Sequence, residues 1–280
     1  MGRVPPSGHP VGTGPVPSFF VTAIHPRVLA IQNDPTDPPL LVGDWLAELG
    51  IVVEVVRAHE GDEVPNVVPA GVHGILALGG SMGANDDVDA PWLRAERALL
   101  RDAVATRTPV LGLCLGSQLL AAALGGKVEL AATTEIGLSL VGPTIEGVED
   151  AVVSAALAAA STDRGGNKSL PAIQWHQDHV AELPQGAHLL LSNDACRVQA
   201  FRVGNSAYGF QCHPEIDAEV CLSWADFADE ALIRSGTDVA TASTAVQEYG
   251  AELVATWRPA TLAWAELVID RCTSTEVSSS

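Results

Sequence analysis

Short apolar runs alternate with helical stretches along the first half of this chain. The apolar runs are residues 28–31, 51–56, 74–78 and 110–113. The helical stretches between them are residues 40–49 and 91–106. Strands that are apolar on both faces are typical of a parallel sheet covered by helices on each side. Ligands bind such sheets at the carboxyl ends of the strands. The pattern therefore predicts an α/β fold with a mainly parallel central sheet and one binding crevice.

The fourth apolar run leads straight into a cysteine and then a helix, in the order Val110–Leu113, Cys114, Leu115–Leu124. Gly112 and Gly116 stand two residues on either side of the cysteine, and glycines tolerate the strained backbone of a sharp strand-to-helix turn. Such a turn lifts the sulfur above the sheet edge, and the N-terminus of the helix favours thiolate over thiol. Cys114 is therefore a candidate nucleophile, although a small buried cysteine between packing glycines has the same local sequence.

A histidine and a glutamate follow another short apolar run later in the chain, within Tyr208–Glu215. His213 is a candidate base, and Glu215 is a candidate carboxylate to orient it. With Cys114 they complete a Cys…His…Glu set, in which a histidine activates a thiol and an acid holds the histidine in the right tautomer.

Composition excludes several classes of protein. The chain has 280 residues, of which 47% are hydrophobic, so it is a packed globular protein. No apolar run approaches the roughly 20 residues needed to span a bilayer, and the first residues hold no signal-peptide pattern. The net charge of −19 argues against nucleic acid, because phosphate binding needs a basic face. Five irregularly spaced cysteines suit a reducing compartment, so we expect a cytoplasmic protein without membrane contact.

Taken together, these motifs and several others along the chain resemble those of a known family. The chain resembles the class I glutamine amidotransferases, the triad glutaminase domains, and within them the stand-alone branch similar to the amidotransferase domain of GMP synthase. The resemblance rests on six segments in the family's order: Leu78–Gly83, Gly112–Gln118, Glu135–Gly137, Trp175–Asp178, Val198–Arg202 and Gln211–Glu215. It implies a flavodoxin-like three-layer sandwich with a mainly parallel central sheet.

Three parts of the chain are expected. Residues 1–26 are rich in Pro and Gly and are predicted to be a disordered leader. Residues 27–230 form the amidotransferase domain that the resemblance covers, and residues 231–280 a C-terminal helical extension and tail. After residue 125 the strands become shorter, which predicts an antiparallel region that closes back to deliver His213. A polar segment at 161–169 is predicted to be a variable insertion.

The resemblance also implies a reaction, which the residue types support. Cys114 would attack the side-chain amide of glutamine and form a γ-glutamyl thioester. His213 would take the thiol proton and later protonate the departing ammonia, while Glu215 orients the imidazole. Water then hydrolyses the thioester, and no cofactor is expected.

Substrate-binding residues follow from the same resemblance. The oxyanion would lie between the backbone N–H groups of Gly80 and Leu115, and Gln118 would hydrogen-bond the substrate. The α-amino and α-carboxylate groups would be held by the backbone around Trp175, His176 and Gln177. No metal site is expected, because the sequence offers no third ligand to His176 and His179, and Glu135 is expected to be a structural acid under the site.

Three positions depart from the family pattern. Ser81 stands where a proline usually follows two glycines, which can loosen the oxyanion strand. Gln177 stands where a glycine is common and can crowd the α-carboxylate site. Cys212 replaces an aromatic residue and is expected to point to the opposite face of its strand from His213.

The sequence leaves three functions open. The chain is either a glutaminase subunit that donates ammonia to a separate synthase or ligase, or a free-standing γ-glutamyl hydrolase or peptidase. The same acyl-enzyme serves both, and the motif set leans slightly to the first. The third alternative is a non-catalytic binding module, which the intact set of Cys114, His213 and Glu215 disfavours.

Overall fold

The computed structural model describes residue 1 and residues 25–160, 163–164, 167–225, 236 and 239–279. Nearly all of the predicted leader at 1–26 and part of the predicted insertion at 161–169 therefore lie outside the described residues. Within the described part, no helix is both long and apolar enough to cross a membrane.

In the described part of the chain, nine strands form one sheet and two short ones form a separate hairpin. Their bounds are β1 Arg27–Gln32, β2 Val52–Arg57, β3 Gly74–Ala77, β4 Val110–Leu113, β5 Lys127–Pro143, β8 Leu170–Glu182, β9 Ala187–Ser192, β10 Ala200–Val203 and β11 Ala207–Phe210, with β6 Asp163–Arg164 and β7 Asn167–Lys168 as the hairpin. The order in the sheet is β2-β1-β3-β4-β11-β10-β9-β5-β8. The first five strands are parallel, and the remaining pairings are antiparallel.

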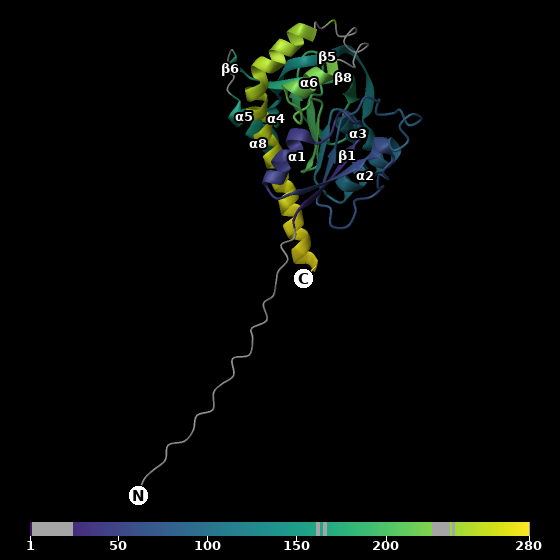
Figure 1. Ribbon diagram of the computed structural model, residues 1–280, viewed down its shortest axis with the longest axis vertical. Helices are drawn as coiled ribbons and strands as arrows, with labels where there is room; N and C mark the ends of the chain where they lie inside the picture. Colours follow the sequence, from purple (N-terminus) through teal and green to yellow (C-terminus); the bar gives the residue numbers. More distant parts are fainter. Residues whose placement is uncertain (2–24, 161–162, 165–166, 226–235, 237–238, 280) are drawn as a thin grey trace.

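Helices cover the two faces of the sheet and make it a three-layer sandwich, as predicted (Figure 1). They are α1 Leu40–Glu48, η1 Ala58–Glu60, α2 Leu93–Ala105, α3 Leu115–Ala123, α4 Ile145–Glu149, α5 Ala151–Ala159, α6 Ala218–Ala225 and α8 Val239–Ser279. One apolar core includes residues of α1, α5 and α8, and the other includes residues of α2 and α3. The predicted C-terminal helix is α8, and its Trp264 is fully buried in the first core.

The antiparallel region predicted after residue 125 is present, but β5 and β8 are long strands rather than short ones. Its last strand, β11, also joins the parallel part of the sheet. One edge of β11 is antiparallel to β10, but its other edge pairs in parallel with β4, so that Phe210 lies opposite Leu113. Two strands that run in the same direction, side by side, end at the same edge of the sheet. Their next residues therefore emerge together, which brings Cys114 after β4 near His213 after β11.

Candidate active site

Cys114 lies at the turn between β4 and α3 in a backbone conformation that non-glycine residues rarely adopt. Its φ is 48° and its ψ is −107°, and such strain typically costs about 1–3 kcal/mol. A side chain at Gly116 would place its Cβ 2.0 Å from the Ala77 carbonyl oxygen, and one at Gly112 would meet the Gly116 carbonyl oxygen at 2.6 Å. The two glycines are therefore required for close packing of this turn against β3, as the sequence pattern indicated.

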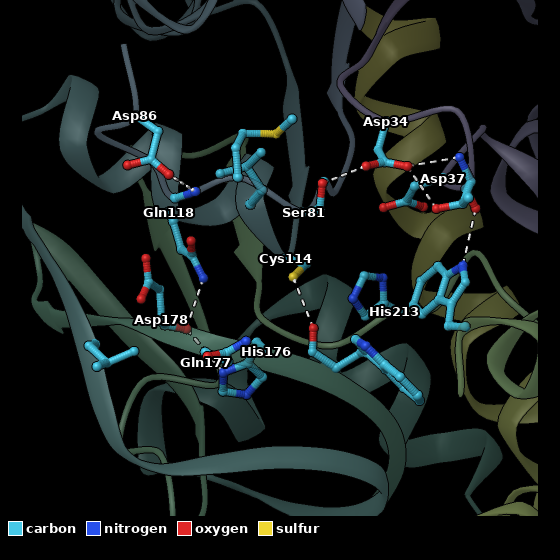
Figure 2. Close-up of a pocket in the computed structure, with 18 residues that line it drawn as sticks. Asp34, Asp37, Ser81, Asp86, Cys114, Gln118, His176, Gln177, Asp178 and His213 are labelled. Atoms are coloured by element: carbon cyan, nitrogen blue, oxygen red, sulfur yellow. Dashed lines mark hydrogen bonds between the residues drawn. The ribbon is translucent and has the colours of Figure 1, made fainter. Parts of the chain in front are cut away.

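The sulfur faces a cavity of about 590 Å³ at the carboxyl ends of the parallel strands. Its walls come from the loop after β1, the loop after β3, the start of α3, the middle of β8 and the segment after β11. Eight of the nine predicted site residues line it: Gly80, Cys114, Leu115, Gln118, Trp175, His176, Gln177 and His213. The ninth, Glu215, is fully buried behind His213. Figure 2 shows Cys114 in the middle of this cavity, with His213 to one side and Gln118 to the other.

His213 and Glu215 form a short buried hydrogen bond, with 2.6 Å between Nδ1 and Oε1. Burial alone would lower the pKa of His213, but the nearby charges of Glu215 and Cys114, together with the polar contacts of the ring with these two residues, raise that pKa well above the usual value. The edge of the His213 ring packs against Trp224 of α6, with 4.8 Å between ring centroids. The imidazolium form is thus favoured next to the sulfur, in a site closed on one side by an indole.

Two further groups touch the sulfur. Gln211 Nε2 lies 3.7 Å from Cys114 Sγ, and the Trp175 carbonyl oxygen lies 3.8 Å from it. Gln118 donates from Nε2 to the Asp178 carbonyl at 2.9 Å and to Gln211 Oε1 at 3.3 Å, so its amide ties α3 to β8. Sequence reasoning did not identify Gln211, although it lies two residues before His213 and the two-residue repeat of an extended chain places both on one face.

Gly80 is held against Leu115 by close packing. A Cβ at Gly80 would lie 3.0 Å from Leu115 Cδ2 and 3.1 Å from Asn33 Cβ. The next residue, Ser81, was expected to loosen this loop. Instead its hydroxyl donates to Asp34 Oδ2 at 2.8 Å and ties the loop after β3 to the loop after β1.

A buried polar network supports β8 from behind. Glu135 accepts hydrogen bonds from Asn193 Nδ2 at 2.7 Å and Gln199 Nε2 at 2.7 Å, and it lies 3.2 Å from His176 Nε2. Burial would raise the pKa of Glu135, but these partners outweigh it and lower that pKa. The other nitrogen of His176 is 3.0 Å from the Asp178 carbonyl oxygen. His176 thus connects the network to the cavity wall, and Glu135 lies under the site as expected.

Glu135, His176 and Cys196 also lie close enough together to suggest a metal site. Burial, and next the charge of Glu135, raises the pKa of the Cys196 thiol to about 12. Cys196 Sγ donates to the Val198 carbonyl at 3.5 Å, and both Glu135 and His176 already have hydrogen-bond partners. The three side chains therefore fit a hydrogen-bonded network.

The cavity walls are acidic. Among the residues that line it are Asp34, Asp86 and Asp178, and none of the lining residues is a lysine or an arginine. A Cβ at Gly83 would lie 3.1 Å from both Asp86 Oδ2 and Asp178 Oδ2, so these two carboxyl groups converge near Gln118 (Figure 2). This end of the cavity suits a positively charged group on a ligand.

The family described as Glutamine amidotransferase class-I matches residues 42–220 of the chain, which is more than half of its length. The chain therefore belongs to the class I glutamine amidotransferases, as the motifs predicted. It is 29% identical over 178 residues to the glutamine amidotransferase-like protein YfeJ of Salmonella typhimurium, a match that covers 62% of this chain and 70% of that protein.

A second relative is a GMP synthase [glutamine-hydrolyzing] of Xanthomonas axonopodis. It is 29% identical over 200 residues, which are 70% of this chain but 34% of the relative, so this chain spans about a third of that protein. A glutamine amidotransferase structure from Methylobacillus flagellatus is 34% identical, with a TM-score of 0.64 over 89% of this chain and 95% of that one. One from Thermotoga maritima has a TM-score of 0.72 at 24% identity over 86% of this chain and 99% of that one, and so shares the fold.

Proposed function

We propose that this chain hydrolyses the side-chain amide of glutamine through a γ-glutamyl thioester on Cys114. The observation that carries the proposal is the position of Cys114, on a strained turn next to the buried His213–Glu215 pair. A thiolate at a helix N-terminus, paired with an imidazolium, is the activated form of a cysteine nucleophile.

The reaction takes two steps. The Cys114 thiolate attacks the amide carbon, and the negative charge on the carbonyl oxygen is stabilised by the backbone N–H groups of Gly80 and Leu115. The His213 imidazolium gives its proton to the amide nitrogen, the C–N bond breaks, and ammonia leaves. His213 then takes a proton from water, whose oxygen attacks the thioester and releases glutamate and the thiolate.

The acidic end of the cavity orients the substrate. The carboxylates of Asp86 and Asp178 attract the α-ammonium group of glutamine, at the Gln118 side of Cys114. The backbone of Trp175, His176 and Gln177 is left to bind the α-carboxylate. Because no lysine or arginine lines the cavity, neutral donors such as these backbone N–H groups supply the contacts of the α-carboxylate.

We further infer that the ammonia passes to a separate synthase or ligase subunit. The support is the relation to GMP synthases, of which this chain matches about a third (34% of the length of one). A free-standing γ-glutamyl hydrolase is the second candidate. The cavity of about 590 Å³ favours it, because such volumes suit ligands larger than one amino acid.

The first test is labelling with a diazo-ketone analogue of glutamine, followed by mass spectrometry of the intact chain. We expect one adduct on the wild-type protein and none on Cys114→Ala. Cys272→Ala, which removes a buried thiol of α8, is the matched control and should still be labelled. An adduct on Cys114→Ala contradicts the proposed nucleophile.

The second test separates the two candidates by kcat/KM of the chain alone. A glutaminase subunit should be slow on glutamine and become faster when its partner is added. A γ-glutamyl hydrolase should be fully active alone and prefer a γ-glutamyl peptide to glutamine. The second result would overturn the amidotransferase assignment and keep the thioester chemistry.

A further inference from the structure

Three buried polar atoms at the back of the site have no hydrogen-bond partner among the residues that the structure describes: His213 Nε2, Glu215 Oε2 and Asp37 Oδ1. The first is the ring nitrogen that would exchange a proton with the Cys114 sulfur. The other two are carboxyl oxygens of neighbouring residues, and Asp37, His213 and Glu215 each have a polar atom within 4.8 Å of the others. A buried oxygen without a partner costs free energy. Two buried carboxyl groups this close together, each with an oxygen that no donor reaches, indicate that one of them holds a proton.

Asp37 is fixed at this place by the backbone around it. It lies in the loop between β1 and α1, is 3% exposed, and donates its N–H to the Asp34 carbonyl at 3.2 Å. A Cβ at Gly79 would come within 1.9 Å of Asp37 Oδ2 and 3.2 Å of His213 Cε1. The carboxyl of Asp37 therefore fills the space that a side chain at Gly79 would take, directly beside His213.

A backbone hydrogen bond joins the start of α1, just after this loop, to the segment that carries Glu215. Leu41, in the first turn of α1, donates its N–H to the Glu215 carbonyl at 3.0 Å. Asp37 and Glu215 thus belong to two chain segments that are hydrogen-bonded to each other. Their closeness follows from the fold and does not depend on one side-chain rotamer.

We propose that Asp37 is a positioning residue whose protonated carboxyl donates from Oδ1 to Glu215 Oε2. Glu215 Oε1 is then left for His213 Nδ1, and every carboxyl oxygen of Glu215 has a partner. Glu215 is held at both ends of its carboxylate, so the plane of the imidazole is fixed toward Cys114. The contact between Asp37 and Glu215 does not depend on the proposed function, but its role in orienting a catalytic His213 does.

Electrostatics agree with this arrangement. Burial, and next the charge of Glu215, raises the pKa of Asp37 well above its usual value, and His213 only partly offsets this. Two carboxyl groups in hydrogen-bond contact cannot both be ionised in a buried site. The groups that face the pair are Asp34 on the same loop, Cys114 on the turn after β4, Cys212 and His213 after β11, and Cys221 on α6.

A metal ion bound by Asp37, His213 and Glu215 is the competing interpretation. A histidine ligand must offer a free lone pair on one ring nitrogen. Nδ1 of His213 is already bonded to Glu215 at 2.6 Å, and a metal on Nε2 would occupy the ring nitrogen that the proposed reaction needs for proton transfer. The proton fits these three side chains and the metal does not.

The test compares Asp37→Asn with Asp37→Leu in the full chain. An asparagine amide keeps a donor for Glu215 Oε2, whereas leucine has similar size and no donor. We expect Asp37→Asn to keep kcat within about threefold, and Asp37→Leu to lower it 10- to 100-fold with little change in KM, an effect typical of a residue that supports a reacting group. Asp44→Asn, on the exposed face of α1, is the matched control.

The possible outcomes distinguish these interpretations. Equal losses in both Asp37 variants overturn the proposal, because a required negative charge on Asp37, or a bound metal, gives that result. An unchanged Asp37→Leu overturns it as well. If wild type itself neither hydrolyses glutamine nor is labelled by the diazo-ketone, the proposed function fails instead.

A second measurement does not depend on activity or on the folding of Asp37→Leu. Infrared difference spectra of wild type minus Asp37→Asn at neutral pH should contain the C=O band of a buried protonated carboxyl group. The control difference, wild type minus Asp44→Asn, should contain none. Absence of the band from the first spectrum contradicts a protonated Asp37.

Discussion

Two buried acidic centres lie on opposite halves of the sheet, and the pKa values of their carboxyl groups shift in opposite directions. In the antiparallel half, Glu135 receives hydrogen bonds from Asn193, Gln199 and His176, and its pKa is lowered. In the parallel half, Asp37 is buried next to another carboxyl group, and its pKa is raised. Burial disfavours the charge at both centres, so the supply of donors decides the outcome.

The architecture explains where donors are available. The parallel strands β3 and β4 are buried along their whole length and consist of apolar residues and glycine, so they offer no side-chain donors. The long strands β5 and β8 are only partly buried and can carry polar side chains on one face. The catalytic chemistry proposed here uses the donor-poor half, where a histidine keeps a strongly perturbed pKa.

The largest effect on kcat is expected when the charge of Glu215, beside Asp37 in the parallel half, is removed. Glu215→Gln should lower kcat by about 10⁴-fold, because an amide favours the wrong imidazole tautomer and removes the charge that supports the imidazolium. Steady-state hydrolysis of glutamine measures this. Glu219→Gln, an exposed glutamate on α6, should leave kcat unchanged. A loss of less than tenfold would mean that Glu215 does not orient His213.

Removing Glu135, the acid of the antiparallel half, should lower the free energy of unfolding. Glu135→Leu leaves His176 and two amides without their acceptor, and breaking such a buried charged network costs about 3–5 kcal/mol. Urea denaturation at pH 7 measures the loss. Because the folded pKa of Glu135 is lowered, its contribution is present above the unfolded pKa and is lost as the pH falls through the folded pKa. The difference from wild type should therefore shrink in acid.

The matched control for that variant is Glu129→Gln, an exposed position on β5. Its ion pair with Lys127 is exposed to solvent, so the loss of this pair should destabilise the protein far less than the loss of Glu135. If Glu135→Leu is no more destabilised than this control, the network does not hold β8.

Glu96 on α2 extends the comparison to a third buried acid. It is fully buried, with one weak donor, Asn33 Nδ2 at 3.4 Å, and burial raises its pKa to about 8. The unfolded chain releases this proton near pH 4.5, so stability should fall as the pH rises from there to about 8, on the order of 3 kcal/mol by pH 7. Glu96→Gln should remove most of this slope.

Denaturation midpoints between pH 5 and pH 8 test the slope, with exposed Glu63→Gln as the control. Wild type and the control should lose stability together as the pH rises, while Glu96→Gln stays nearly level. A parallel course for all three proteins would mean that Glu96 is ionised in the folded state.

The sequence predicts the parallel half better than the antiparallel half, for a physical reason. The runs 28–31 and 110–113 are short and wholly apolar, so burial on both faces follows from composition alone. They appear as β1 and β4 with almost the same bounds. The strand at 207–210 has similar composition, but its place beside β4 depends on which neighbours fill the sheet. No local pattern carries that information.

The residues of the candidate site also differ in how well the sequence predicts their positions. Cys114 and His213 stand in motifs whose spacing reflects local geometry, and both line the cavity. Asp37 lies among three prolines, at 35, 38 and 39, and such a segment predicts an exposed turn. Its burial comes from contact with Glu215, far away in the sequence. Trp224 of α6 packs against the catalytic candidate His213, a contact between residues eleven apart that no local pattern indicates.

The smallest effect is expected at the exposed rim of the parallel half, where Asp34 shows what donors do for an acid near the surface. Burial would raise the pKa of Asp34, but hydrogen bonds from Thr36 and Ser81 together lower it. Ser81→Ala removes one donor and should cost about 0.5–1.5 kcal/mol at pH 7. Because the folded pKa is lowered, this difference should vanish as the pH falls through it. Thermal unfolding at pH 7 and in acid tests this, and a difference that persists in acid would assign the role of Ser81 to packing.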